Sequence, residues 1–322
     1  MKGAALIFLR PERQSIPQAA LRAKVYYRYI LRRLPPHFSA IANPQFIASI
    51  ICGAGRRKYA ILQTMKSAFS TRDTDLLPHG LLATRKWLLA RGMTRHALDN
   101  ALKSGRLVSP ARGLVAQPGT TLTWEAVVVS LQRMNETLVY PGGLSALEFE
   151  GLAHYLQQGK RLHLYSDLPQ PPGWLGRLSL DRTISWHNSR RLWSQPERLA
   201  EHLRKVEWRK GLPELLVARP EQAWLEVLGD VPAWVSFEHA DHLMQGLVSL
   251  SPRRLDALLR QCHHVRVKRL FFFFARRHNP PWFRKLSPED YDLGSGKRVI
   301  VRNGKLDREF LITVPEDLHG AA

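Results

Sequence analysis

The sequence has very few cysteines and no long apolar run. Only Cys52 and Cys262 are present among 322 residues, without the clustering that a disulfide framework or a zinc site requires. The longest uninterrupted apolar stretches, of which Leu270 to Ala275 is one, have six residues, whereas a membrane-spanning helix needs about 20. We therefore expect a cytoplasmic protein without a transmembrane segment and without a membrane partner.

Acidic residues are nearly missing from the first 64 residues. This stretch holds 11 Lys or Arg against Glu12 alone, and its apolar residues keep no steady helical or strand period. We predict that 1–64 is a basic extension, either disordered or translated from a misplaced start codon, in which case Met65 is the better start. A basic amphipathic presequence in "QAALRAKVYYRYILRRL" is the alternative.

Recognisable catalytic motifs are missing as well. The stretch "DLGSGKRV" is not a phosphate loop, because Tyr291 replaces its first glycine and Arg298 replaces the Ser or Thr after the lysine. The acidic pair in "DTD" at 73–75 has no accompanying motif, and the contiguous Cys-His-His at 262–264 would spread its side chains around a helix. No nucleophile elbow, zincin motif or dinucleotide fingerprint occurs. We expect a protein that is not an enzyme and has no cofactor and no metal site.

Basic charge is abundant and concentrated. The chain is 44% apolar, enough for about two domains, and has a net charge of +21. Within 65–322 the net charge is +11, of which 84–118 carries +6 and 253–285 carries +9. Two such segments indicate contact with a polyanion, and a solvated helix face is the alternative for the second.

Residues 84–116 follow the order of a winged helix-turn-helix. Thr84 is expected to cap a helix that Gly92 ends, and Thr94 to cap a second helix that Gly105 ends. Apolar residues recur at i, i+4, i+5, i+8 and i+9 from Met93, which makes one buried stripe. Two short apolar runs around Pro-Ala-Arg-Gly then predict a hairpin, and the second helix of this motif enters the major groove of DNA.

We predict that the outer face of this module contacts double-stranded DNA. Base reading is expected from Arg95, His96 and Asn100, because Arg pairs with guanine and Asn with adenine. Phosphate contacts are expected from five basic residues, namely Arg85, Lys86, Lys103, Arg106 and Arg112. The alternative is a protein-binding module whose charges form a solvated face.

The fold class that we predict is α+β, with a winged helix-turn-helix at 65–119 followed by a mixed α/β domain at 120–322. Strands are expected in "KRLHLYS" and "RTISWHNS", and helices in "WEAVVVSLQRM", "RPEQAWLEVLGD", "SFEHADHLMQGL" and "SPRRLDALLRQC". The stretch "HHVRVKRLFFFFARRH" is either a buried strand or a helix, and its periodicity does not decide between them.

Four stretches carry a family resemblance. They are "LLATRKWLLARGMTRHALDNALKSGRLVSPARGLVA", the run from "RPEQAWLEVLGD" to "RLFFFFA", "YDLGSGKRVIV" and "FLITVP". Together they resemble the AbiEi family of type IV antitoxins over nearly all of 65–322. The resemblance implies a winged domain that represses its own operon by binding the operator. It also implies a C-terminal domain that counters a nucleotidyltransferase-type toxin without a stable complex, and it supplies no catalytic residue.

Two other functions stay open at this point: a stand-alone winged-helix regulator of an unrelated gene, and an enzyme that modifies the toxin. The second basic segment is the candidate surface for toxin neutralisation or a further DNA contact. Its candidate residues are Arg253, Arg254, Arg260, Arg266, Lys268, Arg269, Arg276 and Arg277.

Overall fold

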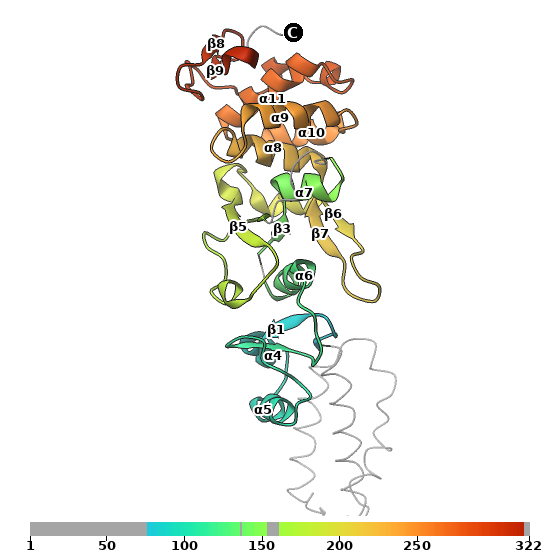
Figure 1. Ribbon diagram of the computed structural model, residues 1–322. Coiled ribbons are helices and arrows are strands. Elements are labelled where there is room, and N and C mark those ends of the chain that lie inside the picture. Colours follow the sequence, from blue (N-terminus) through green and yellow to red (C-terminus); the bar gives the residue numbers. More distant parts are fainter. Residues whose placement is uncertain (1–75, 136, 153–160, 319–322) are drawn as a thin grey trace, which may run out of the picture. The chain divides into compact units, whose positions relative to one another are not determined.

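The computed structural model describes residues 76–135, 137–152 and 161–318. The basic extension predicted over 1–64 and the acidic pair at 73–75 lie outside these residues. The described residues belong to one compact unit of mixed α+β structure with several helices and small sheets (Figure 1). This agrees with the α+β class that the sequence predicts.

Two short helices and two short strands make up the first part. Strand β1 (Leu82–Thr84) leads into helix α4 (Arg85–Ala90), and helix α5 (Arg95–Lys103) follows after a four-residue turn. As predicted, the hydroxyls of Thr84 and Thr94 accept hydrogen bonds from backbone N–H groups in the first turns of α4 and α5. A small buried cluster holds the part together: Leu77, Ala83, Leu88, Met93, Leu98, Ala101, Leu107 and Val115.

The segment after α5 differs from the expected hairpin. Strand β2 (Leu114–Ala116) pairs antiparallel with β1, so that Leu82 lies opposite Ala116. Its link to the preceding apolar run is the single bridge between Val108 and Ala116. Pro110 lies between the two runs and has no backbone N–H to donate, which limits the pairing there. The chain therefore turns back as predicted, but its main strand pairing is with β1.

Helix α6 (Trp124–Met134) connects this part to the rest of the unit. It contacts β1 on one side and two further strands, β3 (Val139–Pro141) and β7 (Leu215–Ala218), on the other. The hydroxyl of Ser130 in α6 accepts a hydrogen bond from the backbone N–H of Leu82, at 3.0 Å. Because this bond is buried, α6 fixes β1 against the larger core.

A three-stranded sheet lies beyond α6. Its order is β3, β4 (Arg161–Ser166) and β5 (Thr183–Asn188), with β3 antiparallel and β5 parallel to β4. Helix α7 (Gly143–Phe149) packs against β4, and β6 (Leu203–Val206) pairs with β7 in a separate hairpin. Both strands predicted from the sequence are therefore present.

Helices dominate the C-terminal part. They are α8 (Pro220–Asp230), α9 (Phe237–Gly246), α10 (Pro252–Gln261) and α11 (Val265–His278), followed by the antiparallel pair β8 (Lys305–Asp307) and β9 (Ile312–Val314). Segments of 3₁₀ helix lie before α8, at Leu175–Arg177, Ser189–Arg191 and Pro196–His202. Others lie between α11 and β8, at Phe283–Lys285 and Pro288–Asp290, and after β9, at Glu316–Leu318.

The ambiguous phenylalanine run is helical. All four residues from Phe271 to Phe274 are buried in α11, which packs against α8, α9 and β9. Rings from other elements, including Trp282, Tyr291 and Phe310, surround the run. A helix that is apolar all round its middle is buried on every side, and this explains why its periodicity is uninformative. None of the described helices is long and apolar enough to cross a bilayer.

Candidate functional site

Helix α5 turns its apolar and polar residues to opposite sides. Leu98 and Ala101 are buried, whereas Arg95, His96 and Asn100 are exposed. The amide nitrogen of Asn100 lies 3.2 Å from Nδ1 of His96, one helical turn away. The three residues predicted to read bases are thus exposed together on one short helix.

The five predicted phosphate contacts have different surroundings. Lys86 and Lys103 are exposed at the start of α4 and the end of α5. Arg106 is exposed as well, and its Nε lies 3.2 Å from the hydroxyl of Ser104. Arg112 is exposed in the turn before β2, where its backbone carbonyl accepts a hydrogen bond from Arg177.

Arg85 already has an anionic partner. Its guanidinium donates a hydrogen bond to the carboxylate of Asp99, and this bond lowers the pKa of Asp99 below its ordinary value. The pair links α4 to α5 across the turn. Arg85 can therefore reach a phosphate only in competition with Asp99.

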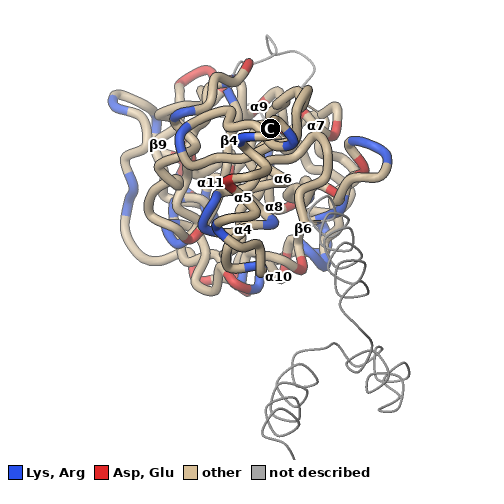
Figure 2. Tube along the Cα trace, turned by 90° about the horizontal axis from the view of Figure 1, so that it is seen from below, with Lys and Arg blue, Asp and Glu red and all other residues tan. Residues whose placement is uncertain are grey.

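The second basic segment is not one exposed surface. Four of its predicted residues are paired with carboxylates: Arg254 with Glu221, Arg260 with Asp256, Arg276 with Asp307 and Glu309, and Arg277 with Asp241. Figure 2 shows Lys and Arg positions in many parts of the trace, with Asp and Glu positions between them. Arg253 is exposed on α10, and Arg266 donates a hydrogen bond to the carbonyl of Gly229.

Lys268 and Arg269 correct the prediction for this segment. They are only 5% and 2% exposed, so neither can lie on a binding surface. Arg269 donates hydrogen bonds to four backbone carbonyls, those of Leu293, Gly294, Gly296 and Leu311. Its charge stabilises the loop before β8, because a buried guanidinium requires a partner for each of its donors.

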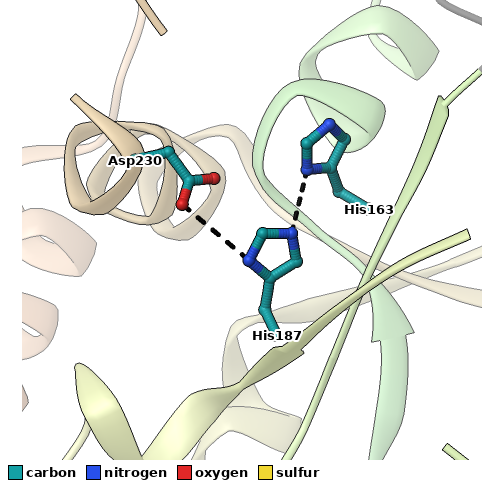
Figure 3. A group of neighbouring side chains, drawn as sticks. All are labelled: His163, His187 and Asp230. Atoms are coloured by element: carbon teal, nitrogen blue, oxygen red, sulfur yellow. Dashed lines mark hydrogen bonds and ion pairs between the residues drawn. The ribbon is translucent and has the colours of Figure 1, made fainter. Parts of the chain in front are cut away.

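A group of titratable side chains that the sequence analysis did not single out lies between the sheet and α8. His163 comes from β4, His187 from β5 and Asp230 from the last turn of α8 (Figure 3). Nδ1 of His163 lies 3.0 Å from Nε2 of His187, and Nδ1 of His187 lies 3.8 Å from the carboxylate of Asp230. Burial lowers the pKa of both histidines to about 4, so both rings are neutral at pH 7.

This group borders a cavity of about 310 Å³. Burial raises the pKa of Asp230 to about 6, and that of the fully buried Glu226, one turn earlier in α8, to about 7. Glu226 accepts hydrogen bonds from Tyr140 and from the backbone of Gly143. The cavity is lined by Tyr165, Trp186, His187, Asn188, Arg191, Leu192, Glu226, Gly229, Asp230, Ala233, Trp234, His264 and Arg266.

Family comparison identifies the chain. A family model described as "Transcriptional regulator, AbiEi antitoxin, Type IV TA system" matches residues 159–315, and the model of the "AbiEi antitoxin N-terminal domain" matches residues 71–158. The chain belongs to the AbiEi antitoxin family. This confirms the resemblance inferred from the four sequence stretches. AbiEi proteins are transcriptional regulators and antitoxins of type IV toxin-antitoxin systems.

The comparison with solved structures found the RV2827C protein from Mycobacterium tuberculosis. That crystal structure matches with a TM-score of 0.45 and 18% sequence identity, over 72% of this chain and 85% of that chain. A search among curated proteins found no match.

The AbiEi chain brings the histidine pair together through strand register. In the parallel pair of β4 and β5, His163 lies opposite Ser185 and Tyr165 lies opposite His187. The two histidines are therefore diagonal neighbours on one face of the sheet. Both predicted strands contain a histidine, but the sequence does not show that the strands are adjacent, parallel and in this register.

Proposed function

We propose that this AbiEi protein represses its own operon, with residues 76–119 acting as a winged helix-turn-helix on operator DNA. The observation that carries the proposal is the exposure of Arg95, His96 and Asn100 on a helix whose opposite side is buried. A regulator of transcription requires a DNA-binding surface, and these side-chain types suit base edges in the major groove. The carboxylate of Asp99, one turn further along α5, is bonded to Arg85 rather than to Arg95, although the charge of Arg95 also helps to lower the pKa of Asp99.

Fluorescence anisotropy with the full chain tests this assignment. Binding to the chain's own upstream DNA and to scrambled DNA is measured at two salt concentrations, for wild type, Arg95→Ala and Arg308→Ala. We expect Arg95→Ala to weaken operator binding by about 1–3 kcal/mol and to change binding to scrambled DNA little, as for a base contact. Arg308 is exposed in the turn between β8 and β9, outside both basic segments, and serves as a charge-matched control that should leave the preference intact.

Two results would count against the proposal. An equal loss on both DNAs would make Arg95 a phosphate contact. Weak binding without any preference for the upstream DNA would contradict the repressor function of this module.

We further propose that the antitoxin counters a nucleotidyltransferase-type toxin without enzymatic activity and without a stable complex. Family membership and the lack of a recognisable catalytic motif support this. Co-expression with the toxin should restore growth while gel filtration of the mixed proteins shows no joint peak. A changed toxin mass after incubation with antitoxin and nucleotide would contradict the non-enzymatic proposal and favour an enzyme that modifies the toxin.

A further inference from the structure

We propose that His163, His187 and Asp230 bind a divalent transition-metal ion, for which Zn²⁺ is the best fit, with one coordination position open to the adjoining cavity. This inference concerns a different part of the chain from the DNA-binding proposal and does not depend on it. It starts from three potential ligand atoms, one from each residue, that lie within 4.8 Å of one another.

The spacing of the two imidazole nitrogens is close to that of two ligands of one ion. Zinc holds its ligands at about 2.0–2.1 Å in a tetrahedron, so that neighbouring ligand atoms are about 3.4 Å apart. The two imidazole nitrogens that face each other are 3.0 Å apart, and the planes of the two rings differ by 21°. His187 presents Nε2 to His163 and Nδ1 to Asp230, and an imidazole can give only one of its nitrogens to a single ion. The Asp230 carboxylate must therefore rotate toward the facing nitrogens of His163 and His187 to complete a set of three protein ligands.

The contact between the two imidazoles also suits a metal. Of the two nitrogens that face each other, one must carry a proton to form a hydrogen bond when no metal is bound, and a metal ion can replace that proton. Asp230 is the last residue of α8, where the helix dipole is negative and favours a cation.

Nearby arginines restrict which cation can bind. The positive charges of Arg161 and Arg191 lie near enough to lower the pKa of the histidines, and those of Arg191 and Arg266 act on Asp230. Two of these guanidiniums have other partners: Arg266 donates to the carbonyl of Gly229, and Arg161 lies over the ring of Trp234. Repulsion by these arginines weakens the binding of any cation. A cation that is attracted by charge alone loses most, whereas a metal ion that forms direct bonds to the ligands can still bind. Mg²⁺ and Ca²⁺ prefer oxygen ligands, whereas two imidazoles and one carboxylate suit zinc.

The cavity leaves room for a further ligand. His187 and Asp230 line it, with side chains that are 18% and 16% exposed, whereas His163 is buried, at 6%. The buried hydroxyl of Tyr165 has no hydrogen-bond partner within standard geometry, although it lies near enough to Asp230 to lower the pKa of that carboxyl. Three protein ligands beside an open cavity are typical of a zinc site that also holds water or an anion.

Titration of the full chain with metal tests the proposal. The protein is first treated with a chelator, and Zn²⁺ is then added in a calorimeter to wild type, His187→Gln, Asp230→Asn and His242→Gln. His242 is exposed on α9 and is the matched control. We expect wild type and the control to bind one equivalent of Zn²⁺ tightly, and the other two variants to bind it at least about 100-fold more weakly. Replacing a residue that only hydrogen-bonds to a metal ligand already lowers metal affinity by about 10–100-fold, so loss of a ligand itself should cost at least as much.

Two further measurements separate lost ligation from lost folding. Circular dichroism checks that each variant is folded, and saturating Zn²⁺ should raise the melting temperature of wild type and His242→Gln but not of the two ligand variants. Co²⁺ should give visible absorption bands of a tetrahedral site only in the proteins that retain the site. The proposal is wrong if wild type shows no saturable binding, or if folded His187→Gln or Asp230→Asn keeps the wild-type affinity.

Discussion

The two basic segments of this antitoxin use their charges in opposite ways. On α5, Arg95 is exposed on a helix that rests on a small core. On α11, Arg269 is 2% exposed, and its guanidinium donates hydrogen bonds to four backbone carbonyls of the same chain. A count of basic residues therefore shows only how much charge needs a partner. Packing decides whether that partner is solvent, a ligand or the protein itself.

The largest expected effect comes from removing the buried charge. Arg269→Ala leaves four backbone carbonyls without their donor, and we expect the free energy of unfolding to fall by on the order of 4 kcal/mol. Arg269→Lys should recover only part of the loss, because an ammonium cannot span four acceptors held by a guanidinium fork. Urea denaturation of both variants measures the difference.

Arg253→Ala is the control for this experiment. Arg253 is exposed on α10, within the same basic segment, and its replacement should change stability by no more than about 0.5 kcal/mol. Equal urea midpoints for Arg269→Ala and Arg253→Ala would show that the hydrogen bonds of Arg269 add no net stability, because water would then satisfy the four carbonyls equally well.

Local features of the first segment could be predicted from the sequence. Thr84 and Thr94 cap their helices as expected, and the stripe that starts at Met93 faces the small core, with Met93, Leu98 and Ala101 buried and Ala97 and Leu102 partly buried. Both depend on interactions within one or two turns of the same helix, which sequence spacing specifies directly. Exposure of Arg95 and its neighbours followed from the same stripe.

Features that depend on distant packing could not be predicted. The burial of Arg269 requires the loop at 293–296 and Leu311 to wrap around α11, and no local pattern indicates this. The grouping of His163 with His187 requires a parallel register between β4 and β5, and Asp230 joins them from a third element. Residues separated by tens of positions meet only through tertiary structure, so spacing motifs do not find them.

A smaller effect is expected from the buried carboxyl of Glu226. Burial raises its pKa from 4.5 to about 7, so the folded protein holds a proton that the unfolded chain releases near pH 4.5. This contribution to stability is present at low pH and is lost as the pH rises through about 7. Each pKa unit of difference between the folded and unfolded states corresponds to about 1.4 kcal/mol, and the pKa of Glu226 differs by about 2.5 units, so the loss of stability is on the order of 3 kcal/mol.

Glu226→Gln should remove that pH dependence. Its free energy of unfolding relative to wild type should become more favourable as the pH rises from 5 to 8, measured by urea denaturation with a chelator present. The two histidines, whose pKa is lowered, contribute the opposite slope below about pH 6.5, but they do so equally in both proteins and cancel in the difference. A difference that stays constant between pH 5 and 8 would show that Glu226 is already ionised in the folded state.

The smallest expected effect concerns Asp99, a carboxylate near the surface, in contrast to the fully buried Glu226. Asp99 is a surface carboxylate whose pKa is lowered by the hydrogen bond from Arg85. Asp99→Asn removes a negative charge from α5 and releases Arg85 for a phosphate, so DNA binding should tighten severalfold and the salt slope should steepen by up to about one unit. Anisotropy titrations at several salt concentrations, with Arg85→Ala and the double variant beside it, complete the comparison. If Arg85→Ala abolishes the gain, Arg85 faces the DNA and Asp99 restrains it; if the gain persists without Arg85, the lost carboxylate acts only through its charge.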